Sequence, residues 1–111
     1  MAASAQRIDA TLEALADPTR RGVVDLLRRQ PCRASDLAAA FSVSNPVMSR
    51  HLRVLRTRGL IEEQRVEHDA RVRLYRLRRQ PFVDLRDWLA EVETFWTDQL
   101  DAFKAHAERS K

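Results

Sequence analysis

Cysteine, glycine and proline are scarce in this chain of 111 residues. Because Cys32 is the only cysteine, the chain can form no internal disulfide and cannot by itself build a thiolate cage around a metal ion. With only two glycines and four prolines, the composition favours a helix-rich chain with few loops. An all-β fold, which needs many turns, is therefore disfavoured.

Long apolar runs are also missing. No stretch approaches the roughly 20 apolar residues that a membrane-spanning helix needs. The first seven residues are not followed by the apolar run of a signal peptide. We therefore expect a cytoplasmic protein without a membrane partner. The length suits one domain, residues 1–111, with one core that a partner could complete.

Basic residues are concentrated in one third of the chain. Residues 44–79 hold ten of the 20 basic residues but only four of the 16 acids, so this third carries +6 and the remainder −2. Arginine makes up 18 of the basic residues; codon bias could explain that preference, but it would not place the charge in one segment. The distribution is typical of a surface that binds a polyanion.

The stretch from Ser42 to Gln64 contains a well-marked amphipathic helix. It begins at Ser44 or Asn45, which are good N-caps, because Pro46 suits the first helical turn. Gly59 ends it. Apolar side chains recur at three- and four-residue steps and form one stripe, at Val47, Met48, Leu52 and Leu55. The opposite face carries arginines without acids, at Arg50, Arg53, Arg56 and Arg58.

The polar face of this helix, residues 45–58, suits the major groove of double-stranded DNA. Short polar side chains at its start can reach base edges, while the arginines meet phosphates. The candidate DNA contacts on this predicted recognition helix are Ser44, Asn45, Val47, Ser49, Arg50, His51 and Arg53. The alternative is an ordinary helix with a solvated basic face, since exposed charge is the common state of helix surfaces.

Three shorter helices precede the predicted recognition helix. Apolar spacing predicts a first helix over residues 8–16, and Asp17 and Pro18 open a second. A third helix of one to two turns covers residues 36–41, followed by a tight turn. Residues 35–58 thus form a helix-turn-helix.

A β-hairpin wing is predicted over residues 60–79. Its first strand covers residues 60–66, and apolar and polar residues alternate in the second over residues 72–77. Such a hairpin can lie along the DNA backbone or in the minor groove. Its candidate DNA contacts are Arg65, His68, Arg71 and Arg73. His68 beside Asp69 could also be read as metal ligands, but a lone pair in a turn more often reflects turn chemistry.

A long final helix is predicted over residues 82–109. Its three- and four-residue repeat forms an apolar stripe of Leu85, Trp88, Leu89, Val92, Phe95, Trp96, Gln99, Leu100 and Phe103. A monomer of this size cannot bury the whole stripe, and exposed apolar patches of this extent mark protein interfaces. We expect the same helix of a second copy, with the first helix and its Leu12, to cover it in a two-fold homodimer. A pocket for an aromatic ligand is the alternative.

Three segments, ALADPTRRGVVDLL, SDLAAAFSVSNPVMSRHLRVLRTRGLIEEQR and RLYRL, follow one another between Leu12 and Leu77. Together they resemble the ArsR-type family of bacterial winged-helix repressors, and the aromatic final helix resembles a subgroup that lacks the family's metal sites. The resemblance implies a mainly α fold with a two-stranded β-wing, in the order α-α-α-α-β-β-α, and a homodimer. It also implies a repressor of its own or a neighbouring promoter that an inducer releases from DNA.

The metal sites of the family do not carry over to this sequence. The family pattern ELCVCDL would place its cysteines at Arg33 and Ser35, and Cys32 lies one position too early. A second family site uses Asp and His at the start of the last helix with His and His or Glu near its end. The histidines here are His51, His68 and His106, which lack that spacing. We therefore expect no metal and no other cofactor.

For DNA, the resemblance holds at the start of the recognition helix. Ser44, Asn45, Ser49 and Arg50 match family positions that face bases and phosphates, and His51 and Arg53 fit phosphate contacts. In a two-fold dimer, two such helices enter successive major grooves, so the operator should be an imperfect inverted repeat.

Other functions have to be weighed against a sequence-specific repressor. A protein-interaction module could use the aromatic final helix and retain only weak, non-specific DNA binding. An enzyme is not supported, since Ser49 and His51 point to different faces of their helix and no nucleophile, base and orienting group cluster. The inducer is left open: oxidation of Cys32, an apolar molecule between the long helices, or no ligand at all would each fit.

Overall fold

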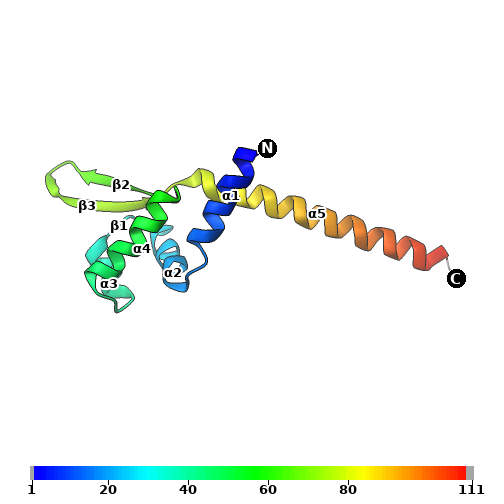
Figure 1. Ribbon diagram of the computed structural model, residues 1–111, viewed down its shortest axis with the longest axis horizontal. Helices are drawn as coiled ribbons and strands as arrows, with labels where there is room; N and C mark the ends of the chain where they lie inside the picture. Colours follow the sequence, from blue (N-terminus) through cyan, green and yellow to red (C-terminus); the bar gives the residue numbers. More distant parts are fainter. Residues whose placement is uncertain (1, 110–111) are drawn as a thin grey trace.

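The computed structural model describes residues 2–109, with the backbone alone at residues 2–4 and at residue 70. Its elements are, in order, α1 (Ala2–Ala14), α2 (Pro18–Leu27), β1 (Cys32–Arg33), α3 (Ala34–Ala40), α4 (Asn45–Thr57), β2 (Ile61–Val66), β3 (Asp69–Leu77) and α5 (Arg79–Arg109). The hairpin of β2 and β3 projects from one end of the helical body, and α5 extends from the other (Figure 1). The protein is mainly helical and has a wing, which confirms the predicted fold class.

The core lies between α2, α3, α4 and the start of β2. The buried stripe of α4 consists of Met48, Leu52 and Leu55, as its spacing predicted. It packs in one cluster with Val23 and Leu27 of α2, Leu37 and Ala38 of α3, Ala14 at the end of α1, and Leu60 and Ile61 after α4. Each fully buried side chain of this size contributes about 1.5–3 kcal/mol, so this cluster fixes which face of α4 points outward.

Both ends of α4 are capped as predicted. The Ser44 hydroxyl accepts the backbone N–H of Val47 at 3.3 Å, and Pro46 lies in the first turn. At the other end, Gly59 adopts φ +86°. Its N–H donates to the carbonyl of Arg56, and that of Leu60 donates to the carbonyl of Leu55. This pair of bonds is the Schellman motif, which satisfies the last carbonyls of the helix.

The turn between α3 and α4 repeats this motif without a glycine. Ser42 has φ +55°, its N–H donates to Ala39 O at 3.2 Å, and the N–H of Val43 donates to Ala38 O at 3.0 Å. The turn also packs closely against α2. Phe41 lies so near Gly22 that a Cβ at position 22 would lie 2.7 Å from Cζ of Phe41. The helix-turn-helix therefore rests directly on α2.

The predicted two-stranded wing is present as β2 and β3, and the short strand β1, which was not predicted, extends it to a three-stranded antiparallel sheet in the order β1-β3-β2. Cys32 lies opposite Tyr75, and Arg33 lies opposite Leu74. A strand of two residues is too short to show an alternating pattern, and it exists only because β3 offers its free edge. The order of elements is thus α-α-β-α-α-β-β-α.

Several predicted boundaries also differ. The first helix covers residues 2–14 instead of 8–16, because Asp17 must leave helical geometry to cap α2 and the chain unwinds two residues earlier. The last helix starts at Arg79 instead of residue 82, since Pro81 is tolerated in a first turn, where its missing N–H would have no partner. The third helix covers residues 34–40 instead of 36–41. The recognition helix ends at residue 57, and the wing strands cover residues 61–66 and 69–77.

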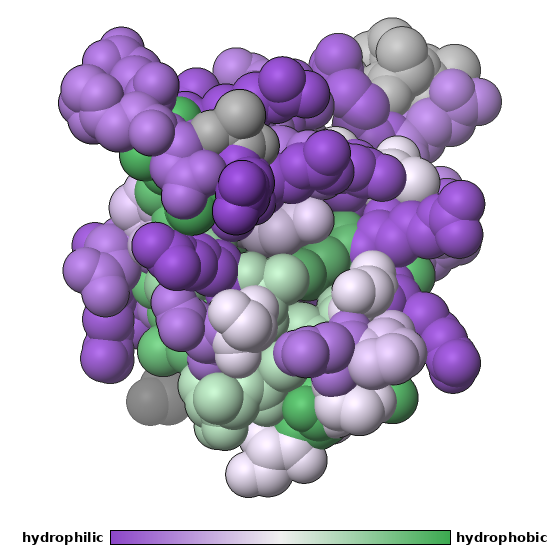
Figure 2. All heavy atoms as spheres, turned by 90° about the vertical axis from the view of Figure 1, so that its left-hand side faces the viewer, coloured by the Kyte–Doolittle hydropathy of each residue, from purple (hydrophilic) through white to green (hydrophobic). Residues whose placement is uncertain are grey.

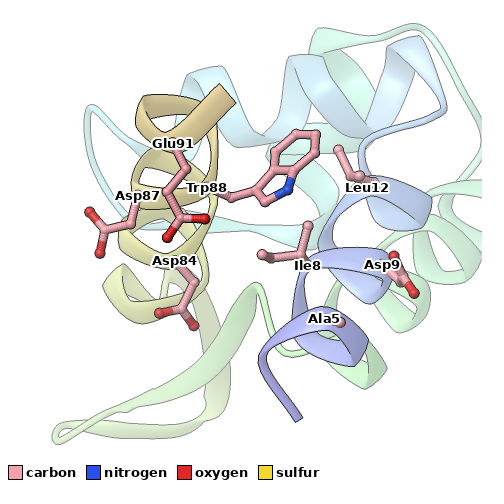
Figure 3. Close-up of a pocket in the computed structure, with 8 residues that line it drawn as sticks. All are labelled: Ala5, Ile8, Asp9, Leu12, Asp84, Asp87, Trp88 and Glu91. Carbon is pink, nitrogen blue, oxygen red and sulfur yellow. The ribbon is translucent and has the colours of Figure 1, made fainter. Parts of the chain in front are cut away.

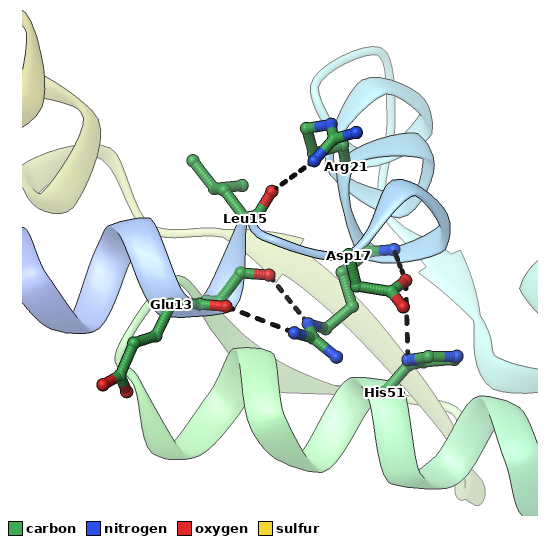
Figure 4. Close-up of polar contacts among 7 residues, drawn as sticks. Glu13, Leu15, Asp17, Arg21 and His51 are labelled. Carbon is green, nitrogen blue, oxygen red and sulfur yellow. Dashed lines mark hydrogen bonds and ion pairs between the residues drawn. The ribbon is translucent and has the colours of Figure 1, made fainter.

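Side chains of α2 join it to α1 (Figure 4). The carboxylate of Asp17 accepts the backbone N–H of Arg20 at 3.1 Å and so caps α2. The guanidinium of Arg20 donates to Ala14 O at 2.7 Å, and that of Arg21 donates to Leu15 O at 2.7 Å. The two arginines therefore satisfy carbonyls that the end of α1 would leave without a partner.

One residue connects the wing to α5. The N–H of Arg78 donates to Leu60 O at 2.9 Å, and its guanidinium lies 3.4 Å from Gly59 O. The ends of α4 and β3 and the start of α5 thus meet at Arg78.

Helix α5 extends away from the core, and none of its residues is buried. The radius of gyration is 19.5 Å, whereas a compact chain of this length has about 13 Å. Among residues 2–109, no helix is both long and apolar enough to cross a membrane. The chain alone leaves most of α5 without a partner.

Replacing Ser42 by glycine should stabilise the protein. A left-handed residue with a Cβ is strained by about 1–2 kcal/mol, and the greater freedom of glycine in the unfolded chain offsets part of that gain. We expect the free energy of unfolding to rise by up to about 1 kcal/mol, measured by urea denaturation at one fixed protein concentration. As a control, Ser49→Gly in the middle of α4 should lower it by roughly 0.5 kcal/mol. A loss of stability in Ser42→Gly would contradict this account.

Replacing Asp17 should reveal the cap of α2 through its pH dependence. The hydrogen bond from the Arg20 N–H lowers the pKa of the Asp17 carboxyl, and nearby His51 lowers it further. Because the pKa is lower in the folded state, the contribution is present above the unfolded value of about 3.9 and is lost as the pH falls through the folded value. Asp17→Ala should cost about 1 kcal/mol at pH 7.

The matched variant Asp17→Asn separates cap from charge, since asparagine caps helices about as well as aspartate. It should unfold like the wild type at pH 7 and lose less stability than the wild type between pH 5 and pH 2. Urea denaturation at both ends of this range measures the difference. Equal acid sensitivity of Asp17→Asn and the wild type would exclude the proposed contribution.

Candidate nucleic-acid interface

The outward face of α4 is polar and exposed at its N-terminal half. Because Met48, Leu52 and Leu55 hold the other side in the core, Ser49, Arg50 and Arg53 point to solvent. The exposed N-cap residue and the first helical residue, Ser44 and Asn45, continue this face to the helix start, and Val47 is half-buried at its edge. Short polar and cationic side chains are thus presented together on one helical surface.

His51 does not belong to this surface. Its side chain is 19% exposed, and its Nδ1 lies 4.0 Å from Oδ1 of Asp17 at the start of α2 (Figure 4). Position 51 follows the buried Met48 by three residues and precedes Leu52, so it lies at the margin of the apolar stripe. The structure therefore separates His51 from the other candidate DNA contacts, and the expected phosphate contact finds no support in its placement.

The arginines at the C-terminal half of α4 are paired with acids from other elements. Arg58 Nη2 lies 2.8 Å from Glu13 Oε2 of α1, and Arg56 Nη1 lies 2.7 Å from Glu63 Oε1 of β2. The helix itself carries no acid, as predicted, but these two arginines have acidic partners on neighbouring elements. Helical spacing alone could not predict these pairs, because both acids come from other elements of the fold.

The wing continues the basic face of α4. In the β2–β3 register Glu63 lies opposite Tyr75, and Arg65 lies opposite Arg73. Since alternate residues share one face of a strand, these two pairs lie on the same side of the hairpin. Arg65 and Arg73 are exposed, and like charges placed directly opposite repel each other. An anion bound at this face would relieve that repulsion.

A groove of about 280 Å³ separates α4 from this face of the wing. It is lined by Ser49, Leu52, Arg53 and Arg56 of α4 and by Glu63, Arg73 and Tyr75 of the wing. Burial raises the pKa of the Tyr75 hydroxyl, and the charge of Glu63 raises it further, so this hydroxyl stays protonated and can donate a hydrogen bond. The sequence prediction missed Glu63, Arg56 and Tyr75 as members of the site, although two-residue alternation from Arg65 and Arg73 would have pointed to the wing residues.

The tip of the wing carries His68 and Arg71 at the surface. The carboxylate of Asp69 accepts the backbone N–H of Arg71 at 3.0 Å, an arrangement typical of turns in which an aspartate bonds two residues on. Within the described part of the chain, no group of three or more His, Cys, Asp or Glu side chains could hold a metal ion. The contact of Asp69 is therefore accounted for by turn chemistry.

Seen from the wing, this end of the molecule is largely hydrophilic (Figure 2). Hydrophilic side chains cover its upper part, where the wing lies in Figure 1, and more apolar side chains gather toward the middle and below. In Figure 1, α4 lies at the same end of the molecule as the wing, and α5 extends toward the opposite end.

Helices α1 and α5 form a second, different surface. Trp88 points from α5 toward Leu12 and Ile8 of α1 beside a cavity of about 450 Å³ (Figure 3). The rest of this cavity is lined by Ala5, Asp9, Asp84, Asp87 and Glu91. Leu12 remains 44% exposed and Trp88 remains 38% exposed, so α1 covers this part of the stripe incompletely.

Beyond α1, the apolar stripe of α5 has little cover. Leu85 and Val92 are half-buried and Gln99 is exposed. The exposed large apolar side chains of α5 beyond Trp88 are Leu89, Phe95, Trp96, Leu100 and Phe103. Phe95 and Trp96 make an edge-to-face contact with ring centroids 5.7 Å apart, which orders the rings without burying them. The structure thus brings the predicted interface residues onto one face.

Comparisons with known proteins agree with this architecture. Residues 17–63 match the family described as "Bacterial regulatory protein, arsR family". The HTH-type transcriptional regulator Rv2034 of Mycobacterium tuberculosis is 34% identical over 95 residues, which cover 86% of this chain and 83% of the relative. The transcriptional repressor SdpR of Bacillus subtilis is 40% identical over 53 residues, which cover 48% of this chain and 59% of SdpR.

Among solved structures, an ArsR-like transcriptional regulator from Rhodococcus sp. RHA1 superposes with a TM-score of 0.80 at 27% identity, covering 97% of this chain and 96% of that one. The similarity therefore includes the wing and the long terminal helix as well as the helix-turn-helix. It confirms the resemblance that the segments from Leu12 to Leu77 indicated. The chain belongs to the ArsR family of bacterial transcriptional regulators.

Proposed function

We propose that this ArsR-family regulator is a homodimeric repressor that binds an imperfect inverted repeat in double-stranded DNA. The observation that carries the proposal is a set of exposed arginines on neighbouring elements, Arg50 and Arg53 on the outward face of α4 and Arg65 and Arg73 on the wing. A repressor role is supported by SdpR, a relative that is named a transcriptional repressor.

In this proposal α4 enters the major groove with its N-terminal end toward the bases. Ser44, Asn45, Ser49 and Arg50 contact base edges and nearby phosphates, because short polar side chains and arginine can approach both. Arg53 contacts phosphate. The wing, with Arg65, Arg73, Arg71 and His68, lies along the backbone or in the minor groove. Val47 supplies an apolar contact at the edge of the helix.

The dimer is supported by the uncovered stripe on α5. Trp96 is 60% exposed and Phe103 is 73% exposed, and apolar surface of this extent calls for a partner. A second copy of α5, with α1 beside it, offers a face of the same chemistry in a two-fold arrangement. Two copies of α4 would then enter successive major grooves about one helical turn apart, which is the basis for expecting an inverted repeat.

Two alternatives have less support. A protein-interaction module with weak DNA binding would use the same α5 stripe, but the family relationship favours regulation through DNA. The second alternative, an enzyme, does not match the role of the family in transcription regulation, and we propose no catalytic activity and no resident cofactor.

We also propose that the protein acts in the bacterial cytoplasm, where its DNA target lies.

Oxidation of Cys32 is not part of the proposed mechanism. Its thiol is half-buried and lies 3.4 Å from Gln30 O. Burial raises the pKa of this thiol, and the charge of Asp36 raises it further. Since the thiolate is the reactive form, a raised pKa lowers the reactivity of the group.

Sequence-specific DNA binding should be measurable by fluorescence anisotropy with a duplex from upstream of the protein's own gene. At physiological salt, affinity for this duplex should exceed that for random duplex by at least about 10³-fold. Arg50→Ala and Ser49→Ala should lower the ratio of the two affinities, since each substitution removes contacts to the bases. Arg71→Ala should instead weaken binding to both duplexes. Because it removes one phosphate contact, it should also reduce the slope of log K against log salt by about 1.

Two outcomes of the anisotropy measurement would count against the proposal. Equal affinity of the wild type for the two duplexes would contradict the proposed sequence-specific repressor. Equal effects of all three variants on both duplexes would contradict the proposal that α4 reads the bases while the wing binds the backbone.

The α5 stripe should determine the oligomeric state. Trp96→Glu places a charge at the centre of the stripe, and we expect it to weaken self-association at least tenfold, measured by sedimentation equilibrium. Thr94→Glu adds the same charge on the opposite face of α5 and serves as the matched control, which should sediment like the wild type. A wild type that sediments as a monomer, or equal effects of the two variants, would contradict the proposed dimer.

A further inference from the structure

Glu63 stands out among the residues between α4 and the wing. Among the described side chains, it is the only acid that lines the groove of Ser49, Leu52, Arg53, Arg56, Arg73 and Tyr75. Its side chain is 25% exposed, less than those of the arginines that it contacts. A carboxylate at the centre of a surface that should bind phosphates requires an explanation, because it repels DNA at close range.

The contacts of Glu63 occupy the cations that DNA would need. Oε1 lies 2.7 Å from Nη1 of Arg56 and accepts a hydrogen bond from the Tyr75 hydroxyl at 3.3 Å. Oε2 lies 3.8 Å from Nη1 of Arg73. A DNA phosphate would present the same chemistry, an anionic oxygen that accepts hydrogen bonds from guanidinium groups. The carboxylate of Glu63 therefore already fills the place of a phosphate between the helix and the wing.

We propose that Glu63 is an internal competitor of DNA phosphate, which weakens non-specific binding by occupying Arg56 and Arg73 in the free protein. This inference rests on the proposed DNA-binding function and concerns the regulation of the same surface. When DNA binds, Arg56 and Arg73 contact a phosphate, either in place of the Glu63 carboxylate or in addition to it. This exchange opposes binding to operator and to random DNA alike, because both complexes form from the same free protein. Random DNA, which is held through phosphate contacts alone, then binds weakly, whereas operator DNA keeps the added affinity of the base contacts.

The neighbouring Glu62 provides a control of the same charge. It lies on the opposite face of β2, where its Oε1 is 2.6 Å from Nη2 of Arg76. In the sheet Glu62 is paired with Arg76, and Glu63 is paired with Tyr75. Glu62→Gln and Glu63→Gln thus change the net charge by the same amount, one residue apart, but only Glu63→Gln frees the groove.

The test is the affinity for a random 20-base-pair duplex, measured by anisotropy across a range of salt concentrations. Freeing one additional cation should steepen the slope of log K against log salt by about 0.9. At 0.15 M salt this corresponds to about fivefold tighter binding for Glu63→Gln. Glu62→Gln should change the affinity less than twofold. Operator affinity should rise by a similar factor, because both complexes exchange the same carboxylate for phosphate.

Several results would overturn the proposal. Unchanged or weaker binding of random duplex by Glu63→Gln would mean that Glu63 positions Arg56 and Arg73 for DNA instead of competing with it. Equal gains in Glu62→Gln and Glu63→Gln would assign the effect to overall charge. If Glu63→Gln is too unstable to measure, Glu63→Thr, which suits a strand, should show the same steeper slope; an unchanged slope in Glu63→Thr would overturn the proposal equally.

This test is independent of sequence specificity. Random duplex binds to any sufficiently basic surface through counterion release, so the comparison of Glu62 and Glu63 can be made even if the wild type fails to discriminate its operator. Failure of the operator measurement would overturn the proposed repressor and leave the salt slopes interpretable. A normal operator preference with unchanged slopes would overturn the competitor role alone.

Discussion

The burial of one stripe of α4 is the constraint on which the rest of the molecule depends. Met48, Leu52 and Leu55 are at most 2% exposed, and the cluster around them includes residues from α1 to β2. Since a helix held along one side can present only the other, this packing turns Arg50 and Arg53 toward solvent. The same cluster includes Leu60 and Ile61, so the start of the wing is fixed relative to α4. The outward direction of Arg50 and Arg53 is therefore a consequence of the core.

Local chemistry made much of this fold predictable. The period of apolar residues predicted the buried side of α4, and the caps at Ser44 and Gly59 predicted its ends to within two residues. The alternation in the wing predicted two strands and the exposure of Arg65 and Arg73. Each of these features is decided within a few residues along the chain, where backbone propensity and side-chain spacing act. The exposed stripe of α5 follows from its period in the same way.

Features that depend on pairing between distant segments were not predictable in this way. β1 is a strand only because β3 lies beside it. Glu63 meets Arg56 because the register of the hairpin and the direction of α4 are both fixed. His51 turns toward Asp17 because α2 packs across α4 at that point. In all three cases the deciding partner lies at least seven residues away, and no spacing rule within one element identifies it.

The single connecting residue between β3 and α5 has a mechanical consequence. Arg78 contributes only two soft backbone torsions, and its N–H is held by Leu60 O. The helix that follows has 31 residues and is about 46 Å long, so a rotation of about 5° at Arg78 moves its far end by about 4 Å. Conversely, clamping the far ends of two such helices together would set the direction of both wings to within a few degrees. In such a pair, contacts at the far end of α5 would act on the direction of the wing through Arg78.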